Sequence, residues 1–165
     1  EDIHSDPNMD YMNIHIWPLN WTWVNKDNLA DKLDVAKTNT LQYIEQHLAI
    51  AEKHGKPLVI EEFGYPRDGY AFSRESTTTA RDSYYDFVFE QVINQAAQKG
   101  NLAGCNFWAW GGSAVPSSEH VFWCAGDDYT GDPAQEEQGL NSVFASDSTM
   151  AVIRDANAKI IAITR

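Results

Sequence analysis

The 165-residue chain has 24 acidic and 12 basic residues, a formal net charge of −12 and 43% hydrophobic residues. This apolar content excludes an intrinsically disordered chain and is sufficient for one compact core. The negative charge disfavours nucleic acid and anionic membranes as partners, because both are bound through clustered Lys and Arg. No stretch is long and apolar enough to span a membrane, and the charged N-terminal residues do not resemble a signal peptide.

The first half of the chain predicts a strand, a helix and a second strand. Residues that favour β-structure alternate from Asp10 to Trp17. Residues 28–54 have apolar side chains at helical spacing, most clearly from Thr40 onward, and Gly55 follows as a stop signal. The continuous apolar run at 58–60 then predicts a short strand that is covered on both faces.

The second half predicts a helix, a third strand, a long loop and a terminal helix. In chain order these are a polar loop (65–76), a helix with apolar positions at 84–96 that closes at Gly100, a buried strand (102–110), a loop rich in Gly, Pro, Asp and Ser (111–138), and a helix from the N-cap Ser148 to about Thr164.

Strands that alternate with long helices predict an α/β fold with a parallel sheet and right-handed crossovers. In such sheets the chemistry gathers at the carboxyl ends of the strands. The residues at these ends that are suited to chemistry are His15, Trp17, Glu62, Trp108 and Trp110. We therefore expect them to border one site.

Two adjacent carboxylates, Glu61 and Glu62, end the second strand just before Gly64. Because successive side chains of a strand point to opposite faces, only one of the two is expected to face the site. The aromatic residues at the same end of the sheet favour Glu62, as a carboxylate that attacks or stabilises an electron-poor carbon. Glu61 is expected on the other face, in a structural hydrogen bond or salt bridge to the helix layer.

His15 and Trp17 lie two residues apart, so both side chains are expected on the same wall of the site. A histidine there can hydrogen-bond a sugar hydroxyl or orient the nucleophile. Trp108 offers a flat apolar surface on which the CH face of a pyranose can stack. Sugar binding and simple packing stay equally open for the loop tryptophans Trp21, Trp23 and Trp123.

Other kinds of site lack their sequence signatures. There is no glycine-rich phosphate loop, no His-x-x-x-His or Cys-x-x-Cys spacing and no Gly-x-Ser-x-Gly elbow, so no metal and no cofactor is predicted. The acidic segment 127–132 lacks the spaced ligands of an EF-hand and predicts a solvated loop rather than a calcium site. Cys105, inside an apolar run, is expected to be a buried thiol rather than half of a disulfide with Cys124.

Four segments together resemble glycoside hydrolases of family 5, in clan A. Residues 57–64 resemble the seventh strand of that family, which ends in Glu, an aromatic residue and Gly. Residues 15–18 resemble the sixth-strand motif His-x-Tyr, and residues 106–111 resemble the eighth strand. With the later segment 139–144, the combination is most similar to the β-mannanases, particularly the bacterial ones.

The resemblance implies a role for each site residue. Glu62 matches the nucleophile of a retaining mechanism, and Trp108 matches the tryptophan that forms the floor of the subsite for the sugar under attack. His15, Trp17 and Trp110 are expected to bind substrate. The family usually has Tyr where this chain has Trp17, and an indole donates a hydrogen bond but cannot accept one.

The resemblance also implies the C-terminal part of a (β/α)8 TIM barrel, strands six to eight with their helices, so that residues 1–165 form part of one catalytic domain. A complete barrel needs about 250 residues. The acid/base Glu of the family follows an Asn at the end of the fourth strand, and this sequence has no such pair at a strand end. We expect the chain to be inactive alone, with the N-terminal part of the barrel supplied by another chain or a missing region.

The expected activity is retaining hydrolysis of β-1,4-mannosidic bonds in mannan-type polysaccharides, without a cofactor. The family resemblance implies a secreted or periplasmic enzyme. The motifs leave two alternatives open: a β-1,4-glucanase (cellulase) of the same clan, and a non-catalytic carbohydrate-binding remnant of a barrel.

Overall fold

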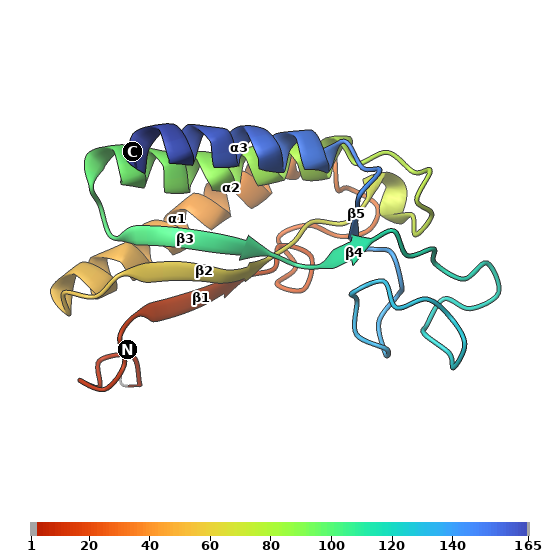
Figure 1. Ribbon diagram of the computed structural model, residues 1–165, viewed down its shortest axis with the longest axis horizontal. Helices are drawn as coiled ribbons and strands as arrows, with labels where there is room; N and C mark the ends of the chain where they lie inside the picture. The colour runs from red at the N-terminus through yellow and green to blue at the C-terminus, as the bar shows by residue number, and fades with distance from the viewer. Residues whose placement is uncertain (1–2, 165) are drawn as a thin grey trace.

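The computed structural model describes residues 3–164 and consists of two small sheets and three long helices (Figure 1). In chain order the elements are β1 (Met12–Ile16), α1 (Leu33–Lys53), β2 (Leu58–Phe63), the 3-10 helix η1 (Asp68–Tyr70), α2 (Thr79–Gln98), β3 (Leu102–Phe107), β4 (Trp110–Gly112), β5 (Val143–Phe144) and α3 (Thr149–Thr164).

The main sheet has the strand order β1-β2-β3, and both neighbouring pairs are parallel. This confirms the predicted α/β fold with a parallel sheet. The three helices lie on one side of the sheet, and the three strands point toward the end of the molecule where the long loop between β4 and β5 lies (Figure 1). The carboxyl ends of the strands therefore meet at one end, as parallel crossovers require.

The two faces of the sheet differ in burial. In β1, Met12, Ile14 and Ile16 are buried toward the helices, whereas Asn13 is half-buried and His15 is exposed. We call these sides the helix-covered face and the open face. In β2, Val59 on the open face is only half-buried, so the prediction of a strand covered on both faces was wrong for the described residues.

Aromatic side chains join the helix-covered face to α2. The Phe63 ring lies 4.8 Å from the Tyr85 ring and 5.7 Å from the Phe89 ring. A buried hydrogen bond of 2.7 Å between Thr40 and the Tyr84 hydroxyl links α1 to α2. Fully burying a side chain such as that of Phe63 contributes about 1.5–3 kcal/mol to stability, so these contacts fix the tip of β2 against the helices.

Two predicted boundaries differ from the structure. α1 begins at Leu33 rather than near residue 28, because the Asn28 side chain accepts a hydrogen bond from the Asn25 backbone N–H and holds this segment in a turn. The predicted strand 102–110 divides at Trp108, and its last part forms β4. There the Ala109 carbonyl accepts a hydrogen bond of 2.7 Å from the Val143 N–H, so the chain pairs with β5, which lies beyond the predicted loop.

A buried charged network anchors the chain around β5. Arg67 and Asp147 form an ion pair of 2.6 Å with both side chains almost completely buried. Arg81, on α2, donates hydrogen bonds to the carbonyls of Tyr65, Leu140 and Ser142. These contacts tie the segment before β5 to α2 and to the loop after β2, as buried charges require partners.

The main sheet has free edges on both sides within residues 3–164, because β1 and β3 each pair only with β2. A groove of about 460 Å³ runs along β3 between α2 and α3, lined by residues that include Val92, Ala96, Cys105, Ile153 and Ile160. In the described part of the chain, none of the helices combines the length and the apolar character needed to cross a membrane.

Candidate active site

Polar side chains gather on the open face at the carboxyl ends of β1 and β2. The Trp17 Nε1–H donates a hydrogen bond of 3.3 Å to Glu62 Oε2. The His15 Nδ1 lies 3.2 Å from the same oxygen. The structure therefore brings together His15, Trp17 and Glu62 around one carboxylate oxygen.

Glu61 faces the same side as Glu62, so the prediction that the two carboxylates point to opposite faces was wrong. Glu61 Oε2 accepts a hydrogen bond from Asn13 Nδ2 and lies 3.6 Å from His15 Nε2. The cause is a β-bulge in β2: Ile14 lies opposite Ile60, but the next residue of β1, His15, lies opposite Glu62. One extra residue in β2 interrupts the alternation, and both carboxylates turn toward the open face.

The His15 ring lies between the two carboxylates, with one nitrogen near each of them. A neutral imidazole can donate a hydrogen bond to one carboxylate, and an imidazolium can donate to both. The ring can thus orient Glu61 and Glu62 together. Its side chain is 46% exposed, so it remains accessible to a ligand at the open face.

Gly64 allows Trp17 to approach the end of β2. A Cβ atom at Gly64 would lie 2.6 Å from Trp17 Cζ3 and 3.2 Å from the Trp108 carbonyl oxygen. The Trp108 N–H donates to the Phe63 carbonyl at 2.8 Å, and the Trp108 carbonyl accepts from the Tyr85 hydroxyl at 3.1 Å. The backbone of Trp108 is therefore held beside the tip of β2, and its peptide bond to Ala109 is cis.

The remaining tryptophans separate into packed and exposed side chains. Trp110 is 54% exposed and belongs to β4, in the second sheet. The Trp21 ring packs 5.0 Å from the ring of Trp23 and 5.0 Å from that of Tyr43 on α1, which favours a packing role for these loop residues. Trp123 is exposed in the loop between β4 and β5.

The loop between β4 and β5 adds an acidic residue near the site. Burial raises the pKa of Glu136, and the negative charges of Asp132, Glu137 and Glu62 raise it further. The segment 127–132 is only partly the solvated loop that its composition predicts. Asp132 is buried, where it accepts hydrogen bonds from the Gly139 N–H and the Ser142 hydroxyl, and burial raises its pKa.

The two cysteines are both free. Cys105 is half-buried in β3, and desolvation raises the pKa of its thiol to about 12, so that it stays protonated at neutral pH. Cys124 is exposed in the loop between β4 and β5.

Asn13, Glu61 and Glu136 belong to the site or its surroundings, and sequence reasoning missed them in these roles. The position of Asn13, two residues before His15, was a usable signal, because side chains at this spacing share a face. Placing Glu61 at the site requires knowledge of the β-bulge, which turns its side chain toward the open face. Glu136 lies 74 positions after Glu62 in a loop whose path no local pattern records.

Comparison with known proteins places the chain in a family. A model of glycoside hydrolase family 5, described as "GH family 5 beta-mannosidase-like", matches residues 1–165. A solved structure of a glycoside hydrolase family 5 mannosidase from Rhizomucor miehei is 31% identical, with a TM-score of 0.86 over 95% of this chain. An endo-β-1,4-mannanase from Thermotoga petrophila, with 24% identity, a TM-score of 0.52 and coverage of 94% of this chain and 27% of its own, shares the fold.

The chain spans only part of these relatives. It covers 39% of the Rhizomucor miehei chain. Mannan endo-1,4-beta-mannosidase 3 of Arabidopsis thaliana is 30% identical over 102 residues, which are 61% of this chain and 22% of that protein. The parallel strands and their helices thus correspond to part of a TIM barrel.

Proposed function

The chain belongs to glycoside hydrolase family 5, and on that premise we propose that it carries the nucleophile of a retaining enzyme that cleaves β-1,4-mannosidic bonds in mannan-type polysaccharides. The observation that carries the proposal is the position of Glu62. Its carboxylate lies at the carboxyl end of a parallel strand, where the Trp17 indole donates to it and the His15 ring contacts it. Active sites of TIM barrels are built at this end of the strands.

Glu62 suits the role of nucleophile better than Glu61. One oxygen of each carboxylate is held by two side chains: Glu61 Oε2 by Asn13 and His15, and Glu62 Oε2 by Trp17 and His15. Glu62 is oriented by the rigid Trp17 indole, which also lies beside Gly64 at the turn out of the strand. We assign Glu61 to positioning, through the imidazole that it shares with Glu62.

In the first half of the reaction a Glu62 oxygen attacks the anomeric carbon, and the bond from that carbon to the leaving oxygen breaks. The leaving oxygen takes a proton from a second carboxylic acid, a Glu outside this chain. In the second half that carboxylate removes a proton from water, the water oxygen attacks the anomeric carbon, and Glu62 is released as a carboxylate. His15 and Trp17 shape the sugar site, Trp108 stacks on the ring, and Trp110 contributes to substrate binding outside this cluster.

We propose that β1, β2 and β3 are strands six to eight of the barrel. The free edges of β1 and β3, and the apolar groove along β3, support this placement, because a closed barrel pairs every strand on both sides. The length of the relatives supports it too. The N-terminal strands and the acid/base Glu would then come from the rest of the barrel, in an enzyme that acts outside the cytoplasm.

A trapped intermediate tests the assignment in the complete enzyme. An activated 2-deoxy-2-fluoro-β-mannoside should react once with the nucleophile and leave a stable glycosyl ester. The fluorine slows both halves of the reaction because it destabilises their oxocarbenium-like transition states, and the activated leaving group restores the rate of the first half only. Peptide mass spectrometry should find the added mass on Glu62. An ester on Glu61 or on any other carboxylate would contradict the assignment.

A reducing-sugar assay separates the activity from its alternatives. Hydrolysis of β-1,4-mannan well above hydrolysis of cellulose is the expected result. The opposite preference would identify a β-1,4-glucanase, and binding of either polymer without hydrolysis would identify a non-catalytic carbohydrate-binding protein.

A further inference from the structure

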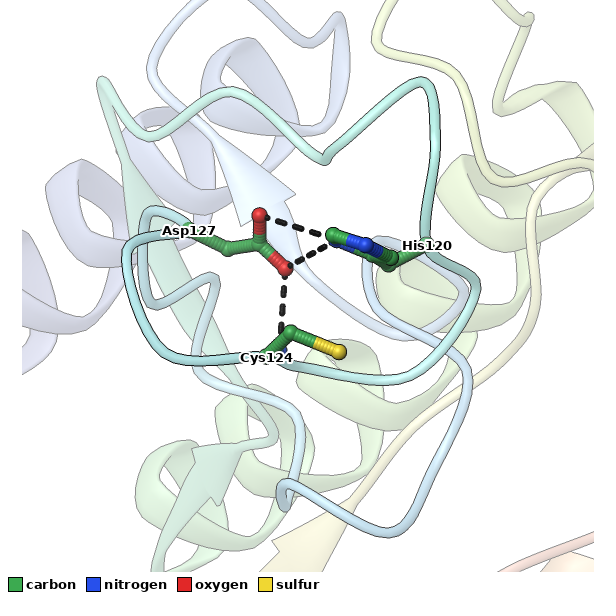
Figure 2. Close-up of side chains that lie close together, drawn as sticks. All are labelled: His120, Cys124 and Asp127. Atoms are coloured by element: carbon green, nitrogen blue, oxygen red, sulfur yellow. Dashed lines mark hydrogen bonds and ion pairs between the residues drawn. The ribbon is translucent and has the colours of Figure 1, made fainter.

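His120, Cys124 and Asp127 bring three different metal-ligating groups together in the loop between β4 and β5. The imidazole nitrogen, the thiol sulfur and a carboxylate oxygen all lie within 4.8 Å of one another. Figure 2 shows the imidazole facing the carboxylate, with the Cys124 side chain beside them inside the turn of the loop. All three residues come from eight consecutive positions, far along the chain from Glu62.

Hydrogen bonds already fold this segment around Asp127. Its carboxylate oxygens lie 3.2 and 3.1 Å from the His120 Nδ1, and one of them accepts a hydrogen bond of 2.9 Å from the Cys124 N–H. The Asp127 N–H donates to the Cys124 carbonyl at 3.0 Å, which closes a turn between the two residues. The backbone therefore holds the thiol and the carboxylate on neighbouring positions of a tight turn.

We propose that His120, Cys124 and Asp127 form a zinc site. Sulfur, imidazole nitrogen and carboxylate oxygen are the three kinds of ligand that Zn²⁺ takes in proteins, at distances of about 2.0–2.3 Å. Hard ions such as Ca²⁺ and Mg²⁺ take oxygen ligands and do not use a thiol. A tetrahedral ion needs its ligand atoms about 3.5 Å apart. The His120 nitrogen and the nearer Asp127 oxygen, at 3.1 Å, already have this spacing, so binding need only bring the thiol, within 4.8 Å of both, closer by about 1 Å, and it leaves a fourth position for water.

Bound zinc would stiffen the part of the loop that carries exposed aromatic residues. The Trp123 Nε1–H donates to the Asp127 carbonyl at 3.2 Å, and Phe122 pairs with Glu137 across the loop. Val121, Phe122 and Trp123 are all exposed. An ion held by Cys124 and Asp127 would restrain the indole in two ways: Trp123 is the chain neighbour of Cys124, and its Nε1–H donates to the Asp127 carbonyl.

The mixed ligand set explains why the sequence predicts no metal. His-x-x-x-Cys-x-x-Asp combines three residue types, and it matches neither the paired histidines nor the paired cysteines of the common zinc motifs. The three side chains come together only in the folded loop, through the turn from Cys124 to Asp127.

Metal titration of the complete protein tests the proposal without any need for catalytic activity, so its outcome is separate from that of the proposed function. The apoprotein is titrated with Zn²⁺ by calorimetry and with Co²⁺ by absorbance. We expect one equivalent to bind at this site, and the bound Co²⁺ to show the charge-transfer band of a thiolate ligand together with the intense visible bands of tetrahedral geometry.

Matched variants locate the site. Cys124→Ser and His120→Ala should each lose this equivalent or bind it at least tenfold more weakly, since even outer contacts of a metal site are worth about 10–100-fold in affinity. Cys105→Ser, which changes the other thiol, should retain it. A Cys124→Ser variant that binds Zn²⁺ as the parent does, a Co²⁺ spectrum without the thiolate band, or no Zn²⁺ binding by the folded parent protein would each overturn the proposal.

Discussion

The helix-covered face and the open face of the main sheet are built from the same three strands, but one face carries buried apolar side chains and the other carries accessible polar ones. On the helix-covered face, Ile14, Ile60 and Phe63 are almost completely buried against apolar and aromatic neighbours. On the open face, His15 and Glu62 are partly exposed and held by polar contacts. Burial stabilises the first face through area removed from water, whereas the second face keeps charged groups accessible to a ligand. Changes on one face should therefore separate stability from activity.

The largest expected effect is on the open face, at Glu62. Glu62→Gln keeps the shape of the side chain and removes the nucleophilic carboxylate, so the turnover of mannan by the complete enzyme should fall at least about 1,000-fold. The thermal midpoint should change little, because the side chain is partly exposed. Turnover within tenfold of the parent enzyme would contradict the role assigned to Glu62.

On the helix-covered face, Ile60→Ala should act on stability alone. Ile60 is completely buried, and removing its side chain should lower the free energy of unfolding by about 3 kcal/mol. Denaturant titration measures the loss, and kcat per folded molecule should stay near the parent value. Val35→Ala, at an exposed position on α1, is the matched control and should cost less than about 0.5 kcal/mol.

At the boundary of the two faces, Gly64→Ala should lower activity about 100-fold. The new Cβ would meet Trp17 Cζ3 at 2.6 Å, so the indole must move away from Glu62. A displacement of about 1 Å at a catalytic group costs on the order of 100-fold in rate. Steady-state kinetics should show the loss mainly in kcat, and a crystal structure of the variant should show the shifted indole. Unchanged kinetics would mean that Trp17 does not position Glu62.

The smallest effect is expected at Glu61. Glu61→Gln keeps the shape of the side chain next to Asn13 and removes its negative charge. That charge lies beside the His15 ring, which also contacts Glu62. We expect steady-state kinetics to show kcat about tenfold lower, which corresponds to the loss of one charged hydrogen bond of about 1.5 kcal/mol. A loss of kcat as large as that of Glu62→Gln would contradict the assignment of Glu61 to positioning and of Glu62 to nucleophilic attack.

Local patterns were sufficient to predict most of the fold. Helical spacing and stop signals located α1, α2 and α3, and alternation placed His15 and Trp17 on one wall. β4 and β5 escaped prediction because each is only two or three residues long and depends on a partner more than 30 positions away.

The site was less predictable than the fold. Alternation assumes an uninterrupted strand, and nothing in the letters at 58–63 records the extra residue that turns Glu61 toward the open face. The position of Glu136 depends on how the loop after β4 is anchored, through Asp132 and the buried arginines, which are contacts between distant segments. Both failures concern geometry that only the folded chain defines.

The bulge adds one residue to β2 and leaves the side chains on both sides of it in phase. Ile60 before it and Phe63 after it both point to the helices, as they would in a regular strand one residue shorter. The bulge therefore presents two carboxylates at the open face while the apolar side chains that flank it stay in the core.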